Sequence, residues 1–562
     1  MTDIEHGSAR TAPEARGAWR RLELWHVLLV LLATAAHWLP RLSGPLDLRY
    51  DAGVYYILGT SLAHGAGYRL LNEPGEIQGI QYPPLLPALI ALHQLALGSD
   101  DPLVVGRALR GSAFVLSLAY AVGAYALARR WLGPWPGLLA GLLTTLYFHT
   151  LFLEDLCFSE IPFAATTVAF FLCAGSRSAR LRAGSPLLAA AAFFLRTAGV
   201  ALLAGWTLSA LVRREWRSFL LRALYSAACV LLWQGYVHHV VSSEEYAHPA
   251  YEYQRAPYQY YNVSYTENVT LLDPFAPEKG RVTPGILAVR AVTNLPKIVV
   301  GMGESVSAAH GFWEWPLRYA ARRLGHWVTL KPVLVPLGAI GVVVLLGLWL
   351  LLRRGALELV LYVACATGLI ALLPWPGQIL RYLAPLVPFL ALALAAAVDA
   401  AGRHRPRRAV GAAGLFVLLQ AGAAWWAFEH YHYALRYPAA RGREVQGELF
   451  LFDDAAQWRS FYASLGWLRN NTEPDALVAA SCPHLVWLHA GRKAVLPPFE
   501  ADPAQVLRLL DAVPVDYAIV DDLSFLDVTR RYAEPALASR PDLWEPVRHD
   551  PAGGLTIYRR RR

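Results

Sequence analysis

Charged residues are scarce in this sequence, and long apolar runs stand in their place. Of the 562 residues, 17% are Asp, Glu, Lys or Arg, whereas 56% are hydrophobic. A soluble chain of this length usually carries a charge on about a quarter of its residues. The shortage argues against a string of soluble domains and favours a chain whose surroundings are mostly lipid.

Cysteine is also rare, and its spacing argues against two further kinds of site. The five cysteines stand singly: Cys157, Cys173, Cys229, Cys365 and Cys482. None belongs to a CxxC pair or to the spacing of a zinc site, so neither a disulfide framework nor a zinc site is predicted. The sequence shows no internal repeat, which argues against a transporter built of two related halves.

The formal charge of +9 does not indicate nucleic-acid binding. The arginines form short clusters between apolar runs, which is typical of the cytoplasmic loops of a membrane protein. Four of them precede the first apolar run, residues 22–40, and no small-residue cleavage site follows that run. We therefore expect a retained first span and a cytoplasmic N-terminus.

One apolar run, residues 83–98, is short for a membrane crossing. Its 16 residues would form a helix of roughly 24 Å, whereas the hydrocarbon core is about 30 Å thick. The run also ends at acidic residues, Asp100 and Asp101. We predict a helix on the outer membrane surface, because every strongly basic short loop then falls on one side.

The other apolar runs predict about eleven membrane helices, counting two short helices that break near residues 196–199. The runs are residues 104–127, 135–150, 161–174, 185–212, 220–241, 332–352, 357–373, 380–400 and 410–426. The expected external stretches are residues 43–103, 151–160 and 242–329. We therefore expect a mainly α-helical, polytopic bundle over residues 1–428.

The composition becomes that of a soluble protein near residue 429. Short β-like runs such as "DALVAAS" and "DYAIVDD" alternate with helix-patterned segments, and the chain ends in "LTIYRRRR". This alternation predicts a small α/β domain over residues 429–562. The predicted topology places it on the extracytoplasmic side.

An acid stands at the outer mouth of the predicted bundle. Asp51 follows the first span in "LRYDAGVYYILGTSLAHGAGY". A carboxylate fixed in this position could deprotonate a hydroxyl nucleophile. The alternatives are a solvated loop carboxylate and the N-cap of a helix that starts at Ala52.

The residues around Asp51 carry a resemblance to a known class. From Asp51 to Pro87 the chain reads D-x-x-x-Y, A-x-G-x-G-Y, a turn-rich stretch and Q-Y-P-P-L-L-P. This resembles the first external loop of the GT-C class of polyprenyl-phosphate-sugar-dependent glycosyltransferases, which includes the protein O-mannosyltransferases and the lipid A aminoarabinose transferase. In that class the first-loop acid is catalytic, and the P-P-L segment begins a helix along the membrane.

Two further motifs match the same class. The run "LEDLCFSEIPF" resembles its second external acidic motif, with Glu160 at the matching position and Asp155 as a competitor. The run "GQILRYLAPLVPFLALALAAA" resembles its R-Y-L-x-P-x-x-P segment, which implies that Arg381 holds a phosphate oxygen. A helix-start carboxylate and an arginine that reaches the lipid headgroups are the structural alternatives for Glu160 and Arg381.

An arginine within the membrane is a further candidate. Arg196 in "FFLRTAGV" could pair with a carrier phosphate or with one of the acids, although a structural ion pair is nearly as good an explanation. The resemblance also implies that tyrosines of the first and third motifs line the substrate site: Tyr55, Tyr82 and Tyr382.

An external stretch is crowded with tyrosines. Seven tyrosines lie between Tyr246 and Tyr265. Their flat faces and hydroxyl tips suit stacking on a sugar, but they suit an aromatic belt at the membrane interface equally well.

The resemblance covers about residues 20–400 and implies an inverting glycosyltransferase of a bacterial inner membrane. Such an enzyme moves a hexosyl or pentosyl group from a polyprenyl-phosphate carrier to a hydroxyl of a lipid, glycan or protein in the periplasm. Gln81 and Tyr82 stand where the lipid A enzyme has Glu and Lys, so no metal ligand is assigned and a divalent metal stays an open alternative. The rival function is a lipid or sugar transporter or flippase, which would spread charged residues through the spans.

Overall fold

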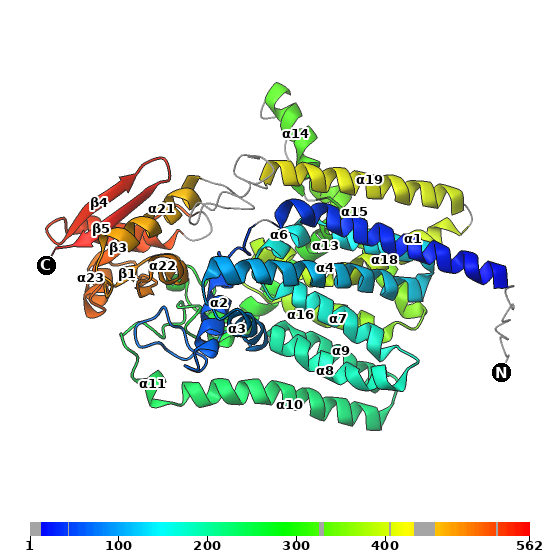
Figure 1. Ribbon diagram of the computed structural model, residues 1–562, viewed down its shortest axis with the longest axis horizontal. Helices are drawn as coiled ribbons and strands as arrows, with labels where there is room; N and C mark the ends of the chain where they lie inside the picture. Colours follow the sequence, from blue (N-terminus) through cyan, green and yellow to red (C-terminus); the bar gives the residue numbers. More distant parts are fainter. Residues whose placement is uncertain are drawn as a thin grey trace.

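The computed structural model describes residues 13–42, 44–308, 310–324, 331–403, 406–431, 456–523 and 527–561. Most of these residues are helical, and a small sheet lies near the end of the chain. Figure 1 shows the helices gathered in one bundle, with the sheet at one of its ends. The predicted combination of a helical bundle and a small α/β part is confirmed.

The bundle consists of long helices with shorter apolar helices between them. The long ones are α1 (Pro13–Trp38), α4 (Pro102–Leu132), α10 (Trp216–Val241), α15 (Leu334–Arg353) and α19 (Pro406–Tyr431). The shorter ones are α5 (Pro134–Leu146), α6 (Phe148–Asp155), α7 (Glu160–Ala174), α8 (Ala179–Leu195), α9 (Val200–Val212), α16 (Leu357–Ala371) and α18 (Val387–Gly402).

Within the described ranges, seven helical segments are long and apolar enough to cross a membrane, or eight if the bent pair α5–α6 is one span. The predicted number of about eleven also relied on α7, α8, α9 and α16, which have only 15, 17, 13 and 15 residues. The predicted break between two short helices is confirmed, because α8 ends at Leu195 and α9 begins at Val200.

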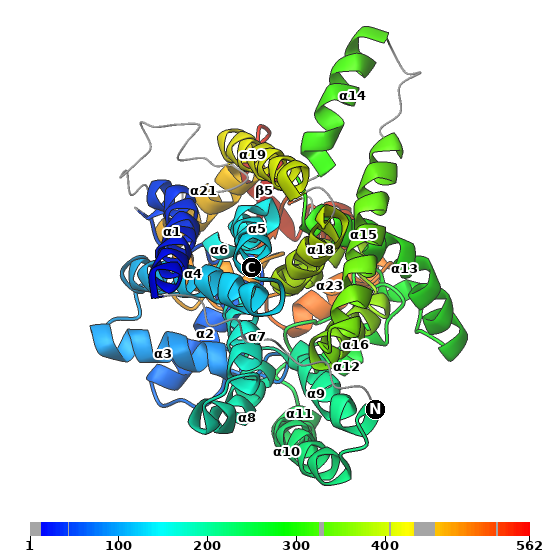
Figure 2. The ribbon, with the colours of Figure 1, turned by 90° about the vertical axis from the view of Figure 1, so that its right-hand side faces the viewer.

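Two helices run across the bundle instead of along it. The helix α3 (Leu85–Leu97) is the short apolar helix that the sequence predicts on the membrane surface. Figure 1 shows α3 nearly end-on where α10 is seen lengthwise, and Figure 2 shows the reverse. Figure 2 also shows α13 (Pro284–Ser305) lengthwise.

The helix α13 lies in a stretch that the sequence predicts to be external. By length and composition it is one of the seven candidate spans, which differs from that prediction. Its contacts lie near the ends of other helices: the Asn294 amide donates to the carbonyl oxygens of Ala371 and Leu373, at the end of α16. Its direction across the bundle and these contacts agree with a helix that lies along the end of the bundle.

The sheet has five strands in the order β2-β1-β3-β5-β4. Its strands are β1 (Val478–Ala479), β2 (Ala494–Val495), β3 (Tyr517–Val520), β4 (Trp544–Asp550) and β5 (Leu555–Arg560). The strand β1 is parallel to β2 and β3, whereas β5 is antiparallel to β3 and β4. Its helices are α21 (Ala456–Asn471), α22 (Pro483–Ala490), α23 (Pro503–Ala512) and α24 (Glu534–Ser539).

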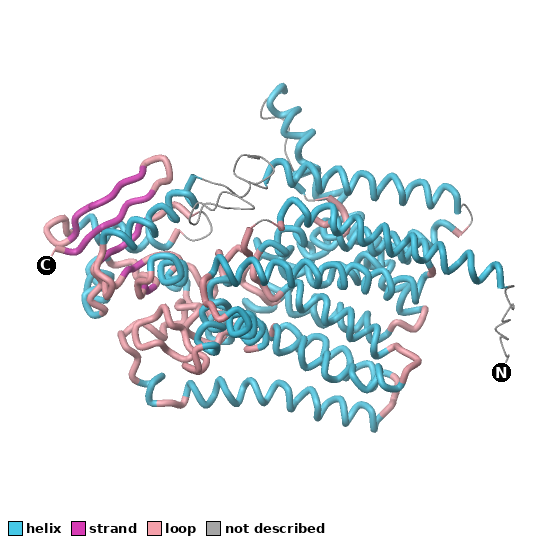
Figure 3. The backbone as a smooth tube through the Cα atoms, viewed as in Figure 1, coloured by secondary structure: helices cyan, strands magenta, loops and turns pink. Residues whose placement is uncertain are grey.

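The predicted domain boundary at residue 429 falls in the last turn of α19, which ends at Tyr431, and residues 432–455 lie outside the described ranges. The α/β part contacts the bundle directly through backbone atoms. The Ala494 amide at β2 donates to the carbonyl oxygen of Asn72 over 2.9 Å. Figure 3 shows many of the loops gathered at this end of the bundle, next to the sheet.

Glycines allow the closest approach between α13 and α15. A Cβ atom at Gly341 would overlap the carbonyl oxygen of Val299, and one at Gly303 would overlap that of Leu337. Backbones can approach this closely in an apolar bundle only where one residue of the pair carries no side chain.

We predict that Gly341→Ala destabilises the protein, because α13 and α15 must separate to admit the methyl group. The expected loss is about 1–3 kcal/mol in the free energy of unfolding, measured by thermal unfolding in detergent. Gly338→Ala on the same helix is the control, since its Cβ would meet only Val300 at an ordinary 3.7 Å. Equal stability of the two variants would contradict the packing described here.

Candidate functional site

Three segments that are distant in the sequence bring charged side chains together at the end of the bundle near the sheet. They are the first turn of α2 (Asp51–Ala63), the first turn of α7 and the helix α17 (Ile379–Leu383). Arg381 lies between the two acids: its Nη2 is 2.5 Å from Asp51 Oδ2, and its Nε is 2.6 Å from Glu160 Oε1. Arg196 Nη1 lies 2.7 Å from the same Glu160 oxygen.

This cluster balances two cations against two carboxylates in a largely enclosed place. The Glu160 side chain is fully buried, whereas those of Asp51, Arg196 and Arg381 keep 21%, 15% and 17% of their surface exposed. Buried charges need partners of this kind, because an unpaired ion loses its hydration without compensation. The partial exposure leaves room for a ligand to reach Asp51 and both guanidinium groups.

Aromatic side chains form the wall around the charges. The guanidinium of Arg381 lies 4.3 Å from the ring centre of Phe158, and that of Arg196 lies 5.7 Å from that of Tyr382. Tyr55 contacts Ser159, with 3.3 Å between the two hydroxyl oxygens, and its ring lies 4.6 Å from that of Tyr82. The three predicted tyrosines, Tyr55, Tyr82 and Tyr382, therefore all lie beside the cluster.

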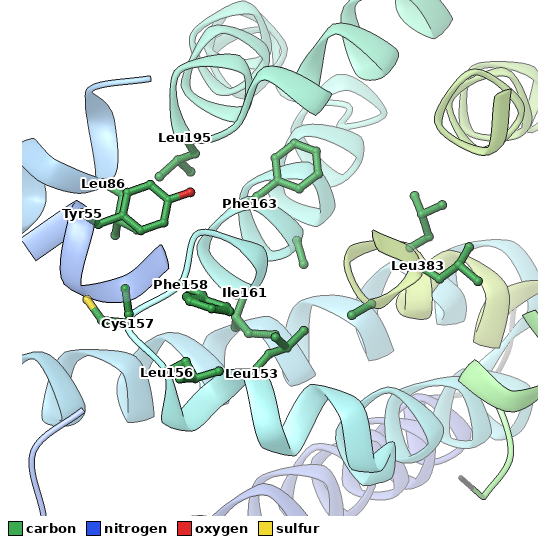
Figure 4. Packing of buried hydrophobic residues seen from close by; sticks show 14 of the residues in the cluster. Tyr55, Leu86, Leu153, Leu156, Cys157, Phe158, Ile161, Phe163, Leu195 and Leu383 are labelled. Atoms are coloured by element: carbon green, nitrogen blue, oxygen red, sulfur yellow. The ribbon is translucent and has the colours of Figure 1, made fainter. Parts of the chain in front are cut away.

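The surrounding apolar packing connects the same elements. Figure 4 shows Tyr55 of α2, Phe158 before α7 and Leu383 of α17 within one apolar cluster. Phe158 and Leu383 are at most 5% exposed. The cluster therefore fixes the three elements that carry the charges relative to one another.

The sequence left open the alternative that Asp51 is the N-cap of the following helix, and the structure shows that it is not. The helix α2 begins at Asp51 itself, and the preceding Tyr50 takes a positive φ of 59°. The Asp51 carboxylate contacts Arg381 and the hydroxyl of Tyr261, and no side-chain cap is made at this helix start.

Asp155, the competitor of Glu160, lies in a different place. Its Oδ1 is 2.7 Å from Arg110 Nη1 and 3.2 Å from Arg41 Nη1, and it is 1% exposed. Its carbonyl oxygen also accepts a hydrogen bond from the backbone amide of Asp47. The structure brings Glu160, and not Asp155, into hydrogen-bond distance of Arg381.

A metal does not fit this arrangement of side chains. Asp51 and Glu160 are both paired with Arg381, which lies between them where a bridging cation would have to bind. No group of three or more His, Cys, Asp or Glu side chains suited to a metal ion occurs in the described part of the chain.

Two residues beside the cluster were not among the predicted site residues. The Tyr261 hydroxyl donates a long hydrogen bond of 3.4 Å to Asp51 Oδ1, and the ring of His484 lies edge-on to Tyr261 with 5.6 Å between ring centres. In the sequence, the run of seven tyrosines from Tyr246 to Tyr265 indicated the segment that contains Tyr261. His484 carries no local pattern, and only the docking of α22 onto α2 reveals it.

Structure comparison finds the same fold in membrane glycosyltransferases. The oligosaccharyltransferase of Archaeoglobus fulgidus matches with a TM-score of 0.52 and 13% identity, over 95% of this chain and 73% of that one. ArnT from Cupriavidus metallidurans, solved with undecaprenyl phosphate, matches with a TM-score of 0.50 and 13% identity, over 96% of this chain and 98% of that one.

A second structure of the Archaeoglobus enzyme AglB, with an inhibitory peptide and a dolichol-phosphate, matches with a TM-score of 0.51 at 13% identity, over 96% of this chain and 74% of that one. No family model and no curated protein matches the sequence. The fold is therefore that of the GT-C class which the motifs resemble.

Next to the cluster, the loop after α2 carries a buried acid. Glu73 accepts hydrogen bonds from the Tyr251 hydroxyl at 2.7 Å and from the Gln254 amide at 3.3 Å. Burial raises the pKa of Glu73 from 4.5 to about 7, although these hydrogen bonds act in the opposite direction. Glu73 and Tyr261 line the same small cavity.

We predict that Glu73 makes the protein less stable as the pH rises from 4.5 to 7. In that window the folded chain holds a proton that the unfolded chain has released, so the stability falls with pH and stays lower above pH 7. Glu73→Gln should gain up to roughly 3 kcal/mol relative to the natural chain between pH 4.5 and pH 8, as measured by thermal unfolding.

The neighbouring Glu76 is the control for this prediction. Its side chain is 45% exposed and pairs with Lys493 at the surface, so Glu76→Gln should change the stability by no more than about 1 kcal/mol. An unchanged pH dependence in Glu73→Gln would show that Glu73 titrates normally in the folded chain.

Proposed function

We propose that the chain is an inverting glycosyltransferase that moves a sugar from a polyprenyl-phosphate carrier to an acceptor hydroxyl at the outer face of the membrane. The observation that carries the proposal is the bridge that Arg381 makes between Asp51 and Glu160 at one end of a GT-C fold. It joins a base, a phosphate-binding cation and a second acid within one enclosed site.

The reaction would be a single displacement at the anomeric carbon. Asp51 takes the proton of the acceptor hydroxyl, whose oxygen then bonds to the anomeric carbon from the face opposite the carrier. The bond between that carbon and the phosphate oxygen breaks, and the polyprenyl phosphate leaves with the electron pair. A phosphate needs no obligatory general acid, because its negative charge is stabilised by cations.

The two arginines keep donors free for this phosphate. Arg381 uses its Nε and Nη2 on the acids, and no described residue accepts a hydrogen bond from its Nη1. Arg196 uses Nη1 on Glu160 and on Ser159. A guanidinium has five N–H donors, so each can hold an anion while Glu160 keeps both in position.

The proposed topology places the N-terminus in the cytoplasm of a bacterial cell and the sheet in the periplasm. Basic residues lie at the ends of α4 and α15, including Arg129, Arg130 and Arg353, as expected for cytoplasmic ends. In this topology α3 and α13 lie along the outer surface, and the carrier tail stays in the membrane. The acceptor is a lipid, a glycan or a protein.

A lipid or sugar transporter is the alternative function. The same cluster would then bind a headgroup without breaking a bond, so an assay of bond cleavage separates the two functions. We therefore choose release of undecaprenyl phosphate as the primary measurement.

We expect purified protein in nanodiscs to release undecaprenyl phosphate from undecaprenyl-phosphate-linked hexoses or pentoses when envelope extract of the producing cells is added. Asp51→Asn should lower this rate by a factor of at least about 100, which is the usual contribution of a general base. Asp100→Asn is the control, because the Asp100 side chain is 53% exposed and pairs with His64. Full activity of Asp51→Asn would overturn the mechanism.

We also expect Arg381→Gln to weaken the binding of undecaprenyl phosphate by roughly 10- to 100-fold, since hydrogen bonds to charged groups contribute about 1.5–3 kcal/mol each. Binding is measured by native mass spectrometry in nanodiscs. Arg318→Gln on α14 (His310–Leu324) is the control, because Arg318 is 60% exposed and pairs with Glu314. Equal affinity of the two variants would remove Arg381 from the donor site.

A further inference from the structure

The α/β part of the chain turns one edge of its sheet toward Asp51. The parallel strands β1 and β3 both end at this edge, and α22 follows β1 directly. In parallel sheets this carboxyl edge is where ligands usually bind. Here α22 lies against α2, the helix that begins with Asp51.

His484 in the first turn of α22 makes the contact with α2. A Cβ atom at Gly53 would lie 2.5 Å from His484 Cδ2, so only a glycine leaves room for the imidazole. Gly53 is two residues beyond Asp51 on the same helix. The ring of His484 therefore lies beside the first turn of α2 and edge-on to Tyr261.

The imidazole of His484 has no hydrogen-bond partner among the described residues. Both Nδ1 and Nε2 are buried and unpaired, and the residue is 2% exposed. Burial lowers the pKa of His484 to about 3, so the ring is neutral at physiological pH and offers one donor and one acceptor. Buried polar atoms without partners are rare, and each calls for a reason.

Tyr261 packs edge-on against this imidazole and also occupies one side of Asp51. Its hydroxyl donates to Asp51 Oδ1 over 3.4 Å, while Asp51 Oδ2 is held by Arg381. Asp51 Oδ1 is thus the oxygen left to take a proton, and the Tyr261 hydroxyl stands where an acceptor hydroxyl would bind. An acceptor must displace Tyr261, and this movement uncovers His484.

We propose that His484 and Tyr261 form the acceptor subsite of this enzyme. The Tyr261 hydroxyl holds the place of the reacting hydroxyl, and His484 hydrogen-bonds a second polar group of the acceptor after Tyr261 has moved. This inference rests on the proposed function and deepens it. The matching acceptor is polyhydroxylated, a saccharide that presents one hydroxyl to Asp51 and another to His484.

In this subsite His484 selects and positions the acceptor and takes no part in bond cleavage. An acceptor without the second polar group would leave both imidazole nitrogens unpaired, which is how buried polar groups reject analogues. A purely structural role of His484 predicts the opposite pattern. If the residue were needed only for packing, replacing it would lower the stability of the protein together with its activity.

The decisive variant is His484→Phe, which keeps a ring but removes both nitrogens. We expect thermal stability and undecaprenyl phosphate binding equal to or above those of the natural chain, because two unpaired buried polar atoms are gone. Transfer to the envelope extract should fall at least 10-fold through a higher KM, while slow donor hydrolysis by water remains.

Two further variants keep this test interpretable. His489→Phe changes another histidine of α22, whose ring packs against Tyr462 with 5.1 Å between ring centres, and should transfer normally. His484→Asn serves if the Phe variant does not fold, and should retain part of the transfer because its amide can still donate and accept. Transfer by His484→Phe at the rate of the natural chain would overturn the inference. A loss of thermal stability that parallels the loss of transfer would overturn it as well.

A second measurement tests the subsite without activity. Diethyl pyrocarbonate modifies neutral, accessible imidazoles, so His484 should be protected in the natural chain and modified in Tyr261→Ala, as read by mass spectrometry. His248, whose side chain is 79% exposed, is the internal standard, and Tyr319→Ala on α14 is the control variant. Modification of His484 in the natural chain would contradict its cover by Tyr261.

The two failures can be told apart. If the natural chain releases no undecaprenyl phosphate from any donor, the proposed function is wrong, and so is the proposal of a saccharide acceptor. If the natural chain is active, Asp51→Asn is inactive and His484→Phe transfers at the rate of the natural chain, only the proposed acceptor subsite is wrong.

Discussion

The guanidinium of Arg381 is the interaction on which the site depends. It joins the Asp51 carboxylate at the start of α2 to the Glu160 carboxylate at the start of α7. Among the described residues, no other arginine contacts both acids. Because buried charges are stable only when paired, this one cation fixes the relative positions of three chain segments. The aromatic wall of Phe158 and the motif tyrosines then packs around an arrangement that the charges have set.

Two neighbouring acids show how strongly position within the fold decides the role of a residue. Asp155 ends α6 and lies between Arg41 and Arg110, where it is buried and also contacts the backbone before α2. Glu160 begins α7 and turns to Arg381 and Arg196. A non-helical link, residues 156–159, separates the two helices, and acids that stand close together in the sequence face different partners.

Sequence patterns were sufficient where a feature depends on local composition. The short apolar helix α3, the break at Arg196 and the α/β character of the tail all follow from length, charge and periodicity. The motifs also singled out Asp51, Glu160 and Arg381, which the fold brings within hydrogen-bond distance, while their chemical roles stay predictions. The direction of α13 and the place of His484 depend on docking between distant segments, and no local pattern carries that information.

The docking of α22 onto α2 has a consequence for how the protein matures. The residues that meet there come from opposite ends of the chain, and one of them, Gly53, has space for His484 only because it lacks a side chain. Contacts of such long sequence separation form late in folding. The helical bundle can therefore be inserted and packed before its site is closed, and a segment synthesised after the bundle helices supplies the wall beside Asp51.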